Sequence, residues 1–149
     1  MVALGLLAGL RGAEHARSVL FALPLAWLAG GLAGMLVGWG PRPVLAAVSF
    51  LVLGALVAAD TAIPRGATVL LASAVGLLHG LINGPSLAAA QLGIRGLLGI
   101  AAAAFVILAL AAAAVLKLHR PWMRIAVRVA GSWIAASGML LVGWSLRSP

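Results

Sequence analysis

The sequence predicts an all-α integral membrane protein, a helical bundle of about six transmembrane helices with almost no soluble part. Of the 149 residues, 64% are hydrophobic and 8% are charged, whereas an average soluble domain is about 45 to 50% apolar and about 25% charged. With a mean hydropathy of +1.21, the chain has too few polar side chains to cover a fold in water. Helices in lipid satisfy their own backbone hydrogen bonds. The long run from Ile100 to Leu116 also lacks the alternation typical of a membrane β-barrel strand.

Charged residues and Pro/Gly clusters divide the chain into six apolar pieces, which we interpret as the spans of a single transmembrane domain. The pieces cover approximately residues 1–10, 18–39, 44–59, 67–90, 96–116 and 125–146. A helical span needs about 17 to 25 apolar residues. The first piece is therefore only half a span, and it resembles the end of a helix whose beginning precedes Met1. The second piece ends at Gly40-Pro41-Arg42-Pro43, where two prolines remove backbone donors from the helix.

The other four pieces end at similar signals. The third is short and stops at the polar turn that begins with Asp60 and contains Pro64. The fourth is long enough for a span but is polar in its middle. The fifth ends at the basic turn that begins with Lys117, and the sixth extends from Ile125 to Leu146. Helix-breaking residues and charged residues thus separate each predicted span from the next.

Basic residues are distributed unevenly between the two ends of this predicted bundle. If each piece crosses the membrane once, the turns after the first, third and fifth pieces share one face. These turns carry Arg11, Arg17, Arg65, Lys117, Arg120 and Arg124, with Arg128 close by, whereas the other face has Arg42, Arg95 and Arg147. Turns rich in Lys and Arg face the cytoplasm, so we expect a bacterial inner-membrane protein with its C-terminus outside. The net charge of +8 then indicates topological anchors and contacts with membrane lipids, and not a nucleic-acid partner.

Small residues mark the surfaces on which we expect the helices to pack. Helices in lipid associate through close backbone approach, which favours Gly and Ala at their contacts. The second piece has Gly30 and Gly34 at a spacing of one helical turn. The fourth piece carries a ladder that consists of Ala72, Gly76, Gly80, Gly84 and Ala88. This ladder predicts that the fourth piece is the central helix, with the alanine-rich fifth piece as one of its neighbours.

Polar residues deep in the membrane are costly and therefore carry the functional information. His79 lies midway along the fourth piece, and helical spacing places Asn83 and Ser86 on the same side. An imidazole nitrogen suits Ni, Co, Cu or Zn, and an amide oxygen can assist it. One histidine and one amide are fewer ligands than a resident metal requires. From spacing alone, hydrogen bonds to neighbouring helices are therefore the simpler explanation of the stripe.

Three further polar residues are secondary candidates for a site. Glu14 and His15 lie in the first turn, where we expect them to be exposed, and Asp60 closes the third piece on the same face. Asp60 either meets these two residues or pairs with Arg65. The chain has no cysteine and only two carboxylates, and it contains neither a nucleophile elbow nor a phosphate-binding loop. We therefore predict that it is not an enzyme.

The segment Leu78-His79-Gly80-Leu81-Ile82-Asn83-Gly84-Pro85-Ser86 falls in register on a motif of the form Phe-His-Gly-x-Ala-His-Gly-x-Glu. This motif is typical of the fourth span of the HupE/UreJ family, small nickel or cobalt permeases associated with hydrogenase and urease systems. The chain also resembles this family over residues 2–36 and 124–144. Asn83 and Ser86 stand where the family has a second histidine and a glutamate. The family's first-span signature, His-Pro-x-x-Gly-x-Asp-His, would lie just before Met1.

Two functions follow from this resemblance. The first is a permease for a divalent transition metal, in which His79 and Asn83 line a path through the bundle and Ni²⁺ or Co²⁺ is the transported ion. The ion is a substrate in this interpretation, and the resemblance implies no resident cofactor. The second is a non-transporting structural or assembly subunit of a larger membrane complex. The resemblance implies that the family's second histidine and its glutamate are metal ligands, and their replacement by Asn83 and Ser86 favours this alternative. The short first and third pieces favour it too, because other membrane subunits would shield them.

Overall fold

The computed structural model describes residues 1–38, 43–118 and 121–147, which form six helices and contain no strand. The helices are α1 (Val2–Arg11), α2 (Ala13–Val37), α3 (Pro43–Ala58), α4 (Arg65–Ala89), α5 (Gly93–Leu116) and α6 (Pro121–Ser145). Four of them, α2, α4, α5 and α6, are long and apolar enough to cross a membrane, and α1 and α3 are shorter apolar helices. The predicted all-α membrane bundle with a short first helix is confirmed.

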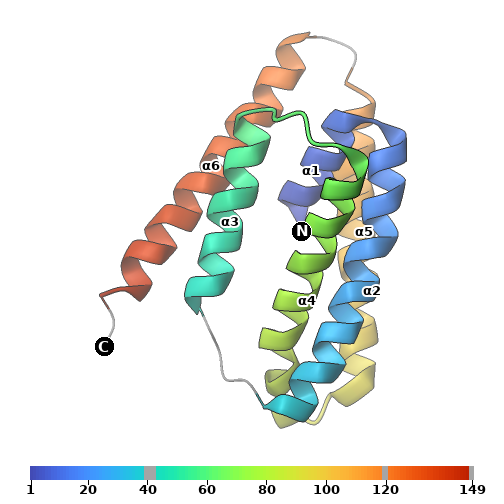
Figure 1. Ribbon diagram of the computed structural model, residues 1–149, viewed down its shortest axis with the longest axis vertical. Coiled ribbons are helices and arrows are strands. Elements are labelled where there is room, and N and C mark those ends of the chain that lie inside the picture. Colours follow the sequence, from blue (N-terminus) through green and yellow to red (C-terminus); the bar gives the residue numbers. More distant parts are fainter. Residues whose placement is uncertain (39–42, 119–120, 148–149) are drawn as a thin grey trace.

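Successive helices run in opposite directions along the long axis of the bundle (Figure 1). The ends of α1, α3 and α5 and the starts of α2, α4 and α6 therefore lie at one end. We call it the basic end because Arg11, Arg65 and Arg124 are located there. Gly12 connects α1 to α2 with φ 107°, a conformation that side chains rarely allow. This glycine lets the chain reverse directly from α1 into α2.

Helices α2 and α4 form the most extensive helix contact, and glycine makes their close approach possible. A Cβ atom on Gly76, Gly80 or Gly84 would overlap the backbone carbonyl oxygens of Leu23, Trp27 and Gly31, respectively. In the opposite direction, Cβ atoms on Gly30 and Gly34 would overlap the carbonyl oxygens of Leu77 and Leu81. The two backbones are thus in direct contact along several turns, the arrangement that small residues permit in membranes.

A second pair consists of α3 and α6, and it stands to one side of the other helices in Figure 1. Here too glycines lie against backbone: Gly54 of α3 faces Ala135, and Gly138 of α6 faces Leu51. Most of α6 is exposed, including Trp133 at 73% and Leu140 at 71%. These apolar side chains suit a lipid environment, where exposure to hydrocarbon carries no cost.

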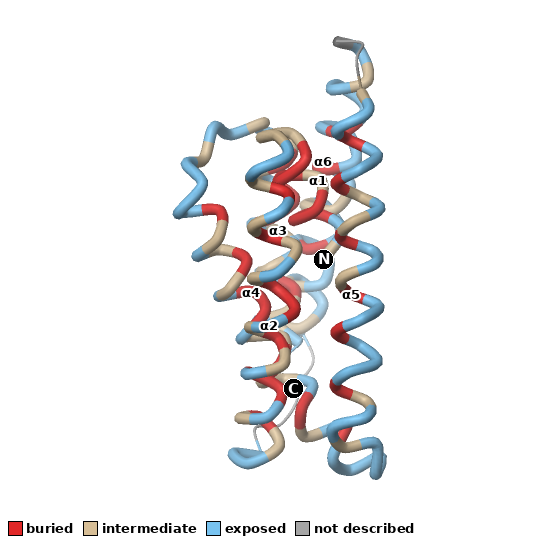
Figure 2. The backbone as a smooth tube through the Cα atoms, turned by 90° about the vertical axis from the view of Figure 1, so that its right-hand side faces the viewer, coloured by how far each residue is buried: buried red, intermediate tan, exposed pale blue. Residues whose placement is uncertain are grey.

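The central helix is α1, and the prediction that the fourth piece would be central is wrong. Leu4 and Leu7 of α1 are fully buried, and Figure 2 shows α1 as a mostly buried segment inside the bundle. Helix α1 contacts α2, α3, α5 and α6, and its Gly5 and Gly9 lie against Ala111 and Val115 of α5. The alanine-rich α5 therefore packs mainly on α1 and α2. A ladder of small residues on one face accommodates one close neighbour, which for α4 is α2, and does not make a helix central.

Candidate functional site

His79 lines a cavity of about 460 Å³ midway along the bundle. All six helices contribute to its wall, including the first residues of α1 and Ser49 of α3. The N-terminus that precedes α1 lies in the middle of the molecule and not at either end (Figure 1). Apart from His79 and Ser49, the side chains around the cavity are apolar. We call this space the His79 cavity.

Ser49 is the hydrogen-bond partner of His79 and was missed by reasoning from the sequence. Its Oγ lies 2.8 Å from Nε2 of His79, and it also donates to the carbonyl oxygen of Ala46 at 2.7 Å. A hydroxyl has one proton, so when that proton is given to Ala46, Nε2 of His79 must be the donor to Ser49. Nδ1 then carries the lone pair, and it has no hydrogen-bond partner among the described residues. The signal that could have identified Ser49 is that it is the only polar side chain between residues 44 and 59.

Asn83 and Ser86 do not line the cavity with His79. Both are exposed, and the Asn83 amide nitrogen donates to the backbone carbonyl oxygen of His79 at 2.6 Å. The amide thus forms a hydrogen bond within its own helix. Short polar side chains readily form such local bonds with the backbone. Helical spacing placed the three residues on one side of α4, but only His79 reaches the cavity wall.

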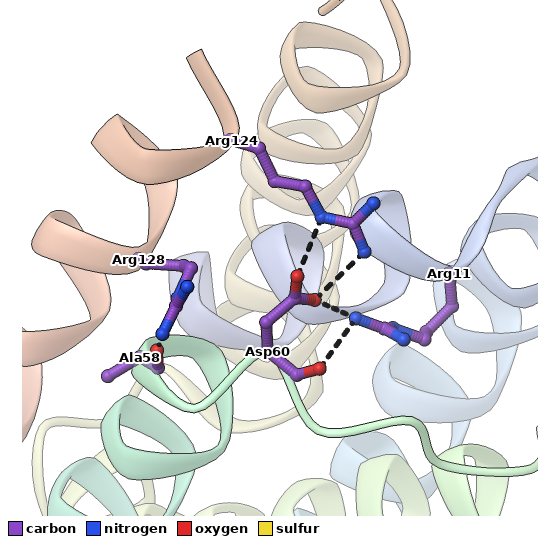
Figure 3. A network of polar contacts seen from close by, with 5 residues as sticks. All are labelled: Arg11, Ala58, Asp60, Arg124 and Arg128. Carbon is purple, nitrogen blue, oxygen red and sulfur yellow. Dashed lines mark hydrogen bonds and ion pairs between the residues drawn. The ribbon is translucent and has the colours of Figure 1, made fainter. Parts of the chain in front are cut away.

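Asp60 lies apart from His79, in a cluster of charges at the basic end (Figure 3). Its carboxylate accepts hydrogen bonds from Arg11 of α1 and from Nε and Nη2 of Arg124 of α6, the latter two at 2.6 and 3.1 Å. Arg11 also donates to the backbone carbonyl oxygen of Asp60 at 3.0 Å. Arg128 donates to the carbonyl oxygen of Ala58 at 2.8 Å. These contacts tie the ends of α1, α3 and α6 together, and we call the group the Asp60 cluster.

Glu14 and His15 do not join the Asp60 cluster, and Asp60 does not pair with Arg65. The side chain of Arg65 instead lies 3.7 Å from the Glu14 carboxylate and donates to Ser18 at 2.9 Å. The reason is that α4 begins at Arg65 and packs on α2, which carries this side chain away from α3. His15 has a buried Nε2 without a hydrogen-bond partner. Glu14 is exposed as expected, whereas His15 is partly buried.

The donor set is sparse for a tightly held metal. Among the described residues, no group of three or more His, Cys, Asp or Glu side chains could hold a metal ion. A resident divalent metal normally has three or four strong protein ligands. The side chains of the His79 cavity offer one imidazole nitrogen and one hydroxyl, and the Met1 amino group lies near His79. This set is too small for tight coordination.

Four long apolar helices, two shorter ones and a polar pair facing an internal cavity define a polytopic helical membrane protein. Residues 1–141 match the family model described as HupE / UreJ protein. The chain therefore belongs to the HupE/UreJ family, as the motif around His79 indicated. No curated protein and no solved structure matches the chain significantly.

Proposed function

We propose that this protein is a permease for nickel or cobalt, and that His79 is the residue that contacts the ion within the bundle. Membership of the HupE/UreJ family supports a transporter-like membrane protein. The observation that carries the proposal is the position of His79 on the wall of a cavity midway between the two ends of the bundle. Ionisable residues that face a cavity within a membrane bundle mark ion pathways among other functional sites, and His79 is placed for such a role.

The size and lining of the cavity favour an ion that keeps most of its water. A water molecule occupies about 30 Å³, so an ion with six waters needs roughly 200 Å³ by that measure, which is less than the 460 Å³ of the cavity. The apolar wall cannot replace a complete hydration shell. Nδ1 of His79 can replace a single water, and such weak binding allows the ion to leave again, as conduction requires.

The proposed orientation places the basic end in the cytoplasm. Arg11, Arg65, Lys117 and Arg124 lie at or near this end, and Lys and Arg are enriched in cytoplasmic turns. We infer on this basis an inner-membrane location with the C-terminal end of α6 on the outer side. A reporter fused after residue 149 tests this orientation: a periplasmic phosphatase should be active there, and a cytoplasmic fluorescent protein should not.

Uptake of radioactive nickel and cobalt tests the permease directly. In cells that lack their own nickel importer, expression of the chain should raise uptake. His79→Ala should remove most of the gain, because no other histidine lines the cavity among the residues that the structure describes. His15→Ala is the matched control, since it removes an imidazole from the basic end, and it should retain uptake. Equal uptake by wild type and His79→Ala, with equal amounts of protein in the membrane, would refute the role of His79.

A structural or assembly subunit is the second candidate, and the sparse donor set favours it. Asn83 and Ser86 lie outside the cavity, and the described residues contain no three-ligand cluster. The short α1, however, packs against α2, α3, α5 and α6 of the same chain. Its shortness therefore does not require a partner subunit to cover it. Purification of the tagged chain from its native membrane distinguishes the two functions. A stoichiometric partner combined with absent uptake supports the subunit.

A further inference from the structure

A second pocket, of about 270 Å³, opens at the basic end between the ends of α1 and α5 and the start of α6. Its polar part comes from Arg11 and Arg124, the two arginines that hold Asp60 (Figure 3). Its apolar part comes from Leu10, Leu116 and Leu118. The pocket thus joins guanidinium groups to an apolar wall at the depth where the helices end.

The charges around this pocket do not balance. Arg11 and Arg124 share the single carboxylate of Asp60, and Arg128 bonds a neutral carbonyl oxygen. A guanidinium has five N–H donors, and Arg124 directs only Nε and Nη2 to Asp60 among the described residues. Arg124 remains 52% exposed although it is paired. The pocket therefore has surplus positive charge and unused donors, the chemistry that recognises a phosphate group.

The apolar wall indicates which phosphate-bearing molecule fits. Leu116, which lines the pocket, is 40% exposed, and Ile125, next to Arg124, is 59% exposed. Apolar surface thus continues from the pocket onto the outer faces of α5 and α6, which lie against hydrocarbon in a membrane. A free phosphate ion would use only the arginines, whereas a phospholipid would use both parts of the lining.

We propose that this pocket binds the phosphate of an anionic phospholipid, whose acyl chains lie along α5 and α6. Basic pockets between transmembrane helices bind anionic headgroups in this way. The surplus positive charge disfavours zwitterionic phosphatidylcholine, because its choline group would be brought close to Arg11 and Arg124. The bound lipid adds a second anion to the Asp60 cluster and thereby helps to hold α1 and α6 together.

Native mass spectrometry of the purified full chain tests this site, with phosphatidylglycerol and phosphatidylcholine as probes. The wild type should retain phosphatidylglycerol at least about fivefold more tightly than phosphatidylcholine, and Arg124→Gln should weaken phosphatidylglycerol binding about fivefold, the size expected for one basic side chain at a membrane surface. Arg11 still pairs with Asp60 in this variant, so the fold should persist. Arg95→Gln is the matched control, because Arg95 is exposed at the opposite end, and its affinity should equal that of the wild type.

Two further measurements keep the outcome decisive. Leu116→Asp places a carboxylate on the apolar rim without removing an arginine, and it should also weaken phosphatidylglycerol binding at least fivefold. Inorganic phosphate at millimolar concentration should displace little lipid. Displacement by phosphate would identify a site for the free ion and overturn the lipid assignment. Equal binding of the two lipids, or equal losses in Arg124→Gln and Arg95→Gln, would mean that lipids contact basic side chains without a specific site. That result would also overturn the proposed lipid site.

Discussion

Two regions of the bundle bring helices together by different means. Helices α2 and α4 meet through backbone, with glycines at the contact and no side chain between them at Gly80 and Gly30. At the basic end, α1, α3 and α6 are joined by long charged side chains around Asp60. The α2–α4 contact requires glycines, which have no side chain. The contact at the basic end requires the carboxylate of Asp60.

This difference predicts how each region responds to change. A close backbone contact tolerates no added volume, because both partners are rigid helices. A charge cluster tolerates small changes of shape but not the loss of its only anion, which leaves partly buried guanidinium groups without a counter-charge. The His79 cavity should be less sensitive than either region. It has room for added volume, and its one polar pair is a hydrogen bond and not an ion pair.

The largest effect is expected from Gly80→Leu, at the centre of the α2–α4 contact. The new side chain would overlap the backbone of Trp27 and Gly31. The cost should be about 3 kcal/mol, the top of the usual range of about 1 to 3 kcal/mol for overpacking. Gly99→Leu is the matched control, because a Cβ at Gly99 meets nothing within 4 Å. Tryptophan fluorescence during thermal unfolding in detergent should show a folded control and a strongly destabilised Gly80→Leu. Similar melting temperatures would mean that α2 and α4 are not in backbone contact.

Asp60→Asn should have the next largest effect. The amide keeps the shape of the side chain but removes the anion that faces Arg11 and Arg124, whose side chains are 13% and 52% exposed. We expect a loss of about 2 to 3 kcal/mol, somewhat below the roughly 3 to 5 kcal/mol for a fully buried pair. Glu14→Gln makes the same chemical change at a carboxylate that is 83% exposed, and it should cost well under about 1 kcal/mol. If the two variants unfolded alike, the Asp60 cluster would be no stronger than a surface ion pair.

The sequence allowed more to be predicted about the glycine contact than about the charge cluster. Glycine at every fourth residue of a helix is a local pattern, so Gly76, Gly80 and Gly84 were identified as a packing face without knowledge of the partner helix. The partners of Asp60 are 49 and 64 residues away in the sequence, and no local pattern specifies them. The neighbouring Arg65 was the obvious alternative, and the direction of α4 removes it from reach.

The same distinction applies to the candidate site. His79 could be identified because a histidine inside an apolar span is rare and costly. The separation of His79 from Asn83 and Ser86 could not be predicted, because it depends on where α3 and the cavity lie relative to α4. Ser49 carries no motif, and its role becomes visible only when Oγ is found next to the imidazole ring.

Ser49→Ala should have a modest effect on stability and tests whether the His79 pair contributes to packing. Removing the hydroxyl leaves Nε2 of His79 without its protein partner, at a cost of about 0.6 to 1 kcal/mol, typical of side-chain hydrogen bonds between membrane helices. Ser137→Ala is the control, since that exposed hydroxyl donates only to the backbone of its own helix, at Trp133. If the melting temperature were lowered equally in both variants, the hydrogen bond between Ser49 of α3 and His79 of α4 would not contribute to stability.

Asn83→Ala should have the smallest effect, although Asn83 lies one turn from His79. The Asn83 side chain is exposed and bonds only the backbone of α4, so its loss should change the free energy of unfolding by less than about 0.5 kcal/mol, as for most surface substitutions. Metal uptake should stay within twofold of the wild type, whereas His79→Ala removes it, because His79 lines the cavity and Asn83 does not. A loss of uptake in Asn83→Ala comparable to that in His79→Ala would show that the ion also passes along the outer face of α4, and the path would then extend beyond the His79 cavity.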